Sequence, residues 1–90
     1  MPSYLVETYL ARSDAQVRVA RERQARSAAA ALTRGMTRVR FDRSIHVPED
    51  EICFYVFDAP SARHAAEAAK RAGLDPIRVV EAVSSGKEKR

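Results

Sequence analysis

The chain has a single cysteine and no long apolar run, and each scarcity excludes a class of protein. One cysteine, Cys53, cannot form an intrachain disulfide, so the fold does not require an oxidising compartment. No stretch approaches the roughly 20 apolar residues that span a bilayer. The N-terminus also lacks the basic and apolar regions of a secretory signal. These absences predict a cytoplasmic protein without a membrane partner.

Alanine and arginine are what the chain has in plenty. Its 90 residues suit one domain, expected over residues 1–83, and the basic segment 84–90 is expected to be a disordered tail. Hydrophobic residues make up 46% of the chain, but many of them are alanines, which bury little area. A thin core in a short chain favours stabilisation by a metal, a ligand or a partner subunit.

The apolar periodicity predicts four strands and two helices. Strands are expected over 3–10, 38–47, 52–58 and 77–83. The first helix is expected over 15–34, capped by Ser13 and stopped by Gly35, and the second between a Ser61 cap and Gly73. The order β-α-β-β-α-β predicts a ferredoxin-like α+β sandwich, with two helices on one face of a four-stranded antiparallel sheet. We name the opposite, uncovered side the open face, and function is expected there.

A hairpin whose turn comprises Pro48 to Glu51 places Val47 opposite Ile52. In this register His46 opposes Cys53, Ser44 opposes Tyr55 and Asp42 opposes Phe57. These residues alternate with a more aliphatic set, which pairs Ile45 with Phe54 and Arg43 with Val56 and which we assign to the helix side. A turn one residue longer or shorter would undo the assignment. Besides His46 and Cys53, the residues expected on the open face are Leu5, Tyr9, Asp42, Ser44, Tyr55, Phe57 and Val79.

Glu7 and Glu81 interrupt otherwise apolar strands that are expected to lie side by side, so the two side chains are expected to be neighbours on one face. A buried carboxylate needs a cation, a donor or a proton. Oxygen, imidazole and thiolate donors together suit a borderline divalent ion such as Ni²⁺, Zn²⁺ or Co²⁺. The candidate metal ligands are Glu7, Cys53, Glu81 and His46. In the competing interpretation the glutamates pair with arginines or face solvent, Cys53 is a small buried side chain, and His46 is exposed near a turn.

Two other function classes stay open. Glu7 and Glu81 could be the acid and base of a small dimeric-barrel enzyme, although no nucleophile motif or phosphate loop is present and no catalytic residue is assigned. RNA-binding domains share the element order and stack bases on strand aromatics, here Tyr55, Phe57 and Tyr9. The segment 51–57 lacks the basic start and the glycines of that motif, which disfavours a nucleic-acid partner.

Several segments resemble one family over nearly the whole chain: Tyr4-Leu5-Val6-Glu7, Val47-Pro48-Glu49-Asp50-Glu51, Cys53-Phe54, Asp58-Ala59-Pro60-Ser61-Ala62 and Arg78-Val79-Val80-Glu81-Ala82-Val83. They are similar to the small bacterial family of nickel-binding-like domains. The resemblance implies a homodimer whose sheets face each other as an α+β barrel, with nickel or another divalent metal as ligand. It carries ligand roles to Glu7, Cys53 and Glu81, whereas His46 rests on the hairpin register alone. The sequence thus predicts a homodimeric metal-binding protein.

Overall fold

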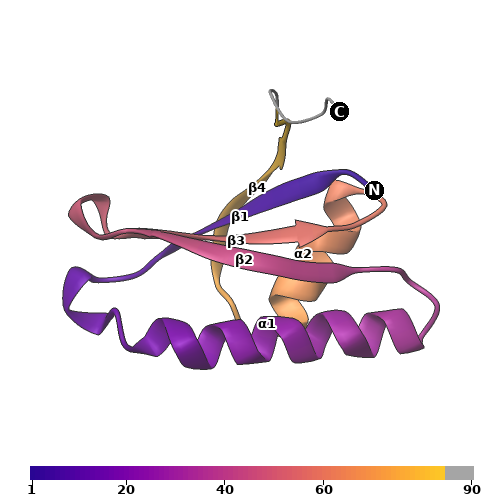
Figure 1. The fold of residues 1–90 in the computed structure, drawn as a ribbon, viewed down its shortest axis with the longest axis horizontal. Coiled ribbons are helices and arrows are strands. Elements are labelled where there is room, and N and C mark those ends of the chain that lie inside the picture. Colours follow the sequence, from indigo (N-terminus) through magenta and orange to yellow (C-terminus); the bar gives the residue numbers. More distant parts are fainter. Residues whose placement is uncertain (85–90) are drawn as a thin grey trace.

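Strands and helices form in the segments where the periodicity predicts them. The computed structural model describes residues 1–84 (Figure 1). Its elements are β1 (Ser3–Tyr9), η1 (Arg12–Asp14), α1 (Val17–Arg34), β2 (Arg40–Val47), η2 (Pro48–Asp50), β3 (Ile52–Asp58), α2 (Ala62–Arg71) and β4 (Pro76–Ala82), where η marks a short 3₁₀ segment. The predicted tail, 84–90, lies outside the described residues apart from Ser84. No helix within residues 1–84 is both long enough and apolar enough to cross a bilayer.

The four strands form one antiparallel sheet in the order β2-β3-β1-β4. In Figure 1, α1 runs lengthwise along one side of the sheet, and α1 packs against β2 while α2 packs against β4 and β1. Buried alanines of both helices belong to one core with side chains from a single face of the sheet, so the two helices cover the same face. The predicted ferredoxin-like α+β fold is therefore confirmed.

The helix ends differ in how well local sequence predicts them. Ser61 caps α2 by accepting a hydrogen bond from the amide of His64, and Gly73 follows the helix with a φ of 78° that suits glycine. Ser13 does not cap α1, because it lies in η1 and the helix begins later. Gly35 ends α1 as predicted, but it is Met36, with a φ of 80°, that takes the left-handed conformation.

The predicted hairpin register is confirmed except at one residue. Val47 pairs with Ile52 and His46 with Cys53, but the register shifts between Phe41 and Arg43. Asp42 is the extra residue of this bulge, so it does not oppose Phe57 as predicted. The competing possibility, a turn of another length, is not realised.

The two faces of the hairpin are the reverse of those predicted. Cys53, Tyr55 and Phe57 are 0% exposed and belong to the core beneath the helices. Ile45 and Phe54, which were assigned to the helix side, lie on the open face. The reason is side-chain volume, because eight of the nineteen buried hydrophobic residues within the described part of the chain are alanine. Helices with such short side chains leave room that only large side chains of the sheet can fill.

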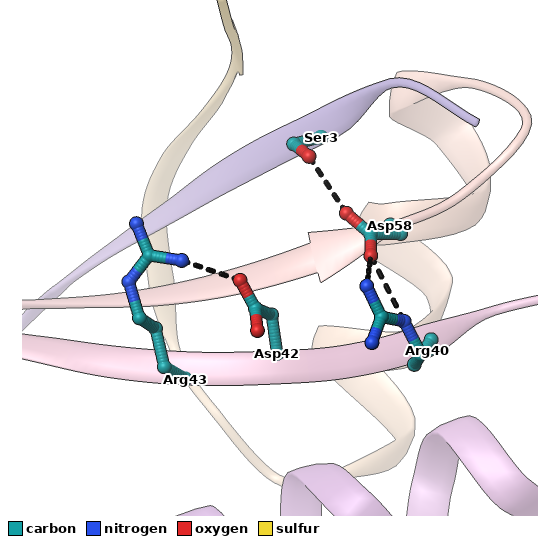
Figure 2. A network of polar contacts seen from close by, with 5 residues as sticks. All are labelled: Ser3, Arg40, Asp42, Arg43 and Asp58. Atoms are coloured by element: carbon teal, nitrogen blue, oxygen red, sulfur yellow. Dashed lines mark hydrogen bonds and ion pairs between the residues drawn. The ribbon is translucent and has the colours of Figure 1, made fainter. Parts of the chain in front are cut away.

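A polar network ties three strands together at one end of the sheet (Figure 2). Ser3 Oγ on β1 donates to Asp58 Oδ1 on β3 over 2.6 Å, and Arg40 on β2 donates to Asp58 Oδ2 through Nε at 3.0 Å and through Nη2. Burial alone would raise the pKa of the Asp58 carboxyl. The hydrogen bonds from Ser3 and Arg40 and the charge of Arg40 outweigh that effect, so the pKa lies below its ordinary value.

We expect Asp58→Asn to lower the free energy of unfolding by about 1–2 kcal/mol at neutral pH, because it removes a charge-assisted hydrogen-bond acceptor. A carboxyl with a depressed folded pKa stabilises above its unfolded pKa of about 4 and loses that contribution as pH falls through the folded value. Urea unfolding as a function of pH should therefore show the gap between wild type and variant closing in acid. A gap that persists at low pH would contradict this account.

The matched control is Asp42→Asn, since Asp42 pairs with the exposed Arg43 on a strand edge. Exposed ion pairs contribute little, about 0–1 kcal/mol.

Candidate functional site

The centre of the open face is mainly apolar and carries one ion pair. The residues of this centre are Leu5, Glu7, Ile45, Phe54, Val56, Arg78 and Val80, and Tyr9 follows on β1. The network of Ser3, Asp58 and Arg40 lies at one end of the same face. Glu7 lies between Phe54 and Arg78 on the neighbouring strands, and Arg78 Nε donates to Glu7 Oε1 over 2.8 Å. The Glu7 side chain is only 14% exposed, whereas that of Arg78 is 66% exposed. Arg78 thus satisfies the Glu7 carboxylate, as expected in the competing interpretation that the glutamates pair with arginines.

The covered side of the sheet holds a second polar group, the His46–Cys53 pair, between α1 and the end of the hairpin. His46 on β2 lies directly opposite Cys53 on β3. The thiol is fully buried, as the competing interpretation expected, while His46 is partly exposed. The Nε2 atom of His46 is buried and has no hydrogen-bond partner among the described residues.

Tyr55 brings a third polar atom to this side. Burial raises the pKa of its hydroxyl above the usual range, and the neighbouring Cys53 thiol raises it further, whereas the guanidinium of Arg21 acts in the opposite direction. Burial likewise raises the pKa of the thiol, with Tyr55, Arg18 and Arg21 acting in the opposite direction. The hydroxyl and thiol are close enough to influence each other, but no hydrogen bond of good geometry satisfies the hydroxyl within residues 1–84.

Residues of α1 border this group. Glu22 and the hydroxyl of Ser44 on β2 are hydrogen-bonded, so Ser44 faces the helix rather than the open face. The guanidinium of Arg21 reaches the carbonyl of Tyr9 over 3.4 Å. Two imperfectly satisfied buried atoms, on His46 and Tyr55, thus lie beneath charged residues of the helix.

The four predicted metal ligands do not come together. Glu7 is on the open face, and His46 and Cys53 are on the covered side. Glu81 lies opposite Tyr4, on the covered side of edge strand β4, and is exposed to solvent. Within residues 1–84, no three His, Cys, Asp or Glu side chains are placed to share an ion. As a four-ligand set in one subunit, these residues do not fit a metal.

The other residues expected on the open face divide in the same way. Leu5 and Tyr9 lie there, on alternate positions of β1. Tyr55 and Phe57 are in the core, Val79 packs against it, and all three are corrections to the predicted face. The predictions for Asp42 and Ser44 were also wrong. Asp42 lies in the β2 bulge, and Ser44 contacts α1.

These placements bear on both alternative functions. Glu7 and Glu81 lie on opposite sides of the sheet, so the prediction that they are neighbours on one face is wrong and they cannot form an acid–base pair within one subunit. Tyr55 and Phe57 are buried against the helices, so neither can stack on a nucleic-acid base. Only Tyr9 of the three proposed stacking aromatics is exposed on the open face.

Sequence reasoning missed Arg78 and Phe54 as components of the open face. The available signal was side-chain alternation on β1, where Tyr4, Val6 and Thr8 form an uncharged set and Glu7 must face the other way. Side chains opposite each other on paired strands share a face. Extending the face of Glu7 across the sheet would have selected Phe54 and Arg78.

Comparison with known proteins adds to the fold but not to the site. No family model and no curated protein matches the chain. A solved structure, described as "Crystal structure analysis of SCO4226 from Streptomyces coelicolor A3(2)", is similar with a TM-score of 0.67 and 18% sequence identity. The similarity covers 93% of this chain and 99% of that one, and at this identity it supports the fold alone.

Removing the unpartnered hydroxyl of Tyr55 is expected to stabilise the fold. A buried polar atom without a hydrogen bond costs about 1–3 kcal/mol, so Tyr55→Phe should raise the free energy of unfolding, by about 1 kcal/mol. Chemical denaturation measures the change, with Tyr4→Phe as a control at another buried tyrosine. A destabilised Tyr55→Phe variant would mean that the hydroxyl has a partner in solution.

Proposed function

We propose that this protein is a homodimeric metal-binding protein whose subunits pack together through their open faces. The observation that favours a dimer is the composition of the centre of that face, which is mainly apolar around the Glu7–Arg78 ion pair. The observation that favours a metal is the His46–Cys53 pair with its unpartnered Nε2 atom.

The argument for a dimer begins with the one-sided coverage of the sheet. Phe54 and Leu5 lie on the two central strands and Val80 on edge strand β4, and all three are only partly buried. Contiguous apolar surface of this kind is typical of an interaction site. A second copy of the chain would complete the core that alanine-rich helices leave thin.

The charges on the open face favour a second copy of this chain as its binding partner. The face carries Glu7 and Arg78 side by side, so its central charges cancel. In a two-fold symmetric contact each residue meets a patch identical to its own, and such a patch has to be self-complementary. The carboxylate of one subunit can then approach the largely exposed guanidinium of the other.

A charge placed at the centre of this face tests the dimer. Phe54→Asp should weaken association by roughly 100-fold or more, because it removes an aromatic anchor and buries a carboxylate. Light scattering coupled to gel filtration measures the oligomeric state. Val19→Asp is the control, since Val19 is a 60% exposed apolar residue on α1. A monomeric wild type, or a dimer disrupted by Val19→Asp instead, would refute the proposed interface.

The argument for a metal rests on donors rather than on a complete site. The imidazole of His46 and the thiol of Cys53 are cross-strand neighbours, and nitrogen with sulfur suits nickel, zinc or cobalt. The unpartnered Nε2 is free to act as a ligand, and His46 reaches the surface at the edge strand. When bound, the ion would hold the thiol as a thiolate.

Titration of the full-length, tag-free protein with Ni²⁺ and Zn²⁺ by calorimetry tests this pair. His46→Ala and Cys53→Ala should each reduce affinity by about tenfold or more, and Ni²⁺ should produce a thiolate charge-transfer band that Cys53→Ala abolishes. Glu81→Gln is the control. Glu81 is exposed and pairs with Tyr4 at one end of β1, whereas Cys53 pairs with Thr8 near the other end. Binding that depends on Glu7 and not on His46 or Cys53 would place the metal on the open face and overturn this assignment.

A further inference from the structure

A groove lies between the two helices, on the side of the molecule away from the open face. It has a volume of about 510 Å³, within the range of sites that hold small molecules. Arg23, Gln24 and Ser27 of α1 line one side, and Arg71 lines the other at the end of α2. Arg23 and Ser27 are four residues apart and therefore project from the same face of α1.

Small side chains form the base of this groove. Ala28 and Ala72 are buried at 4% and 6% exposure, and Ala31 lies one turn further along α1. Gly73 borders the groove with open space where a Cβ would stand. Since alanine and glycine leave the space between the helices unfilled, a hollow persists there with an apolar base and a polar rim.

The charge in the groove is positive on both sides. Neither Arg23 nor Arg71 forms an ion pair with any described residue, whereas Arg40, Arg43 and Arg78 of the sheet each pair with a carboxylate. No Asp or Glu lines the groove within residues 1–84. Arg23 and Arg71 are exposed, so both guanidiniums are available to a ligand.

The end of α2 opposes an anion less than a free helix C-terminus would. Its last carbonyls would carry partial negative charge if they were unpaired. Here the amide of Ala72 donates to Ala68, that of Gly73 to Lys70 and that of Leu74 to Ala69, at 2.9, 3.0 and 3.0 Å. These bonds occupy the carbonyls of Ala68, Ala69 and Lys70, and the side chains of Lys70 and Arg71 add positive charge at the same end.

We propose that this interhelical groove binds a small organic phosphomonoester. Two guanidiniums from different helices match a dianion with three acceptor oxygens, and the amide of Gln24 and the hydroxyl of Ser27 supply further donors. The alanine base receives the apolar body of the ligand. The site is separate from the proposed dimer face and from the His46–Cys53 pair, and it remains accessible when the open faces are packed together.

Amide NMR spectra of the full-length protein, titrated with phenyl phosphate at about 0.15 M salt, test this site. The amides of Ser27 and Gly73 should shift and saturate. Arg23→Gln and Arg71→Gln should each weaken binding about tenfold, because each removes a charge-assisted hydrogen bond. Ala31→Leu should weaken binding as strongly without any change in charge, since the larger side chain occupies the groove.

Arg63→Gln is the matched control, as it removes one positive charge from α2 outside the groove. Equal weakening by Arg63→Gln would reveal nonspecific attraction to a basic surface and overturn the proposal. Absence of saturation up to about 10 mM phenyl phosphate would do the same. Benzoate that binds as tightly as phenyl phosphate would refute a phosphate site.

Discussion

The close approach of two alanine-rich helices to one side of the sheet is the constraint on which the other features depend. Ala65 and Ala69 of α2 and Ala25 and Ala29 of α1 are all buried, with exposures of 0–3%. Their short side chains bring the helix backbones near the strands but supply little volume. The bulk of the core therefore has to come from the sheet, through aromatic side chains such as Phe57, and this requirement decides which face of each strand points inward.

The element order and most boundaries could be predicted because they depend on local signals. Ser61 and Gly73 bound α2 through cap and turn chemistry that acts within a few residues. The start of α1 could not be predicted in this way, since η1 competes with the helix for the same segment. The bulge at Asp42 depends on how β2 follows the twist of β3, which no local pattern encodes.

The candidate site was harder to predict, and the reason lies in β3. Both faces of this strand are apolar, so alternation within it does not distinguish inside from outside. The distinction comes from partners: β1 turns Glu7 outward, and the alanine helices accept Tyr55. Once the faces are corrected, Glu7 separates from Cys53. The constellation predicted as one site then becomes an ion pair on one side and a polar cluster on the other.

The burial of Cys53 has a consequence for how the domain moves. Its thiol is the chain's only one and is 0% exposed, close enough to Arg18 and Arg21 of α1 for their charges to affect it. A reagent can modify such a thiol only after the helix has lifted from the sheet or the whole domain has unfolded. The rate of alkylation therefore reports how often α1 detaches, and a comparison with global unfolding distinguishes local breathing of one helix from cooperative loss of the fold.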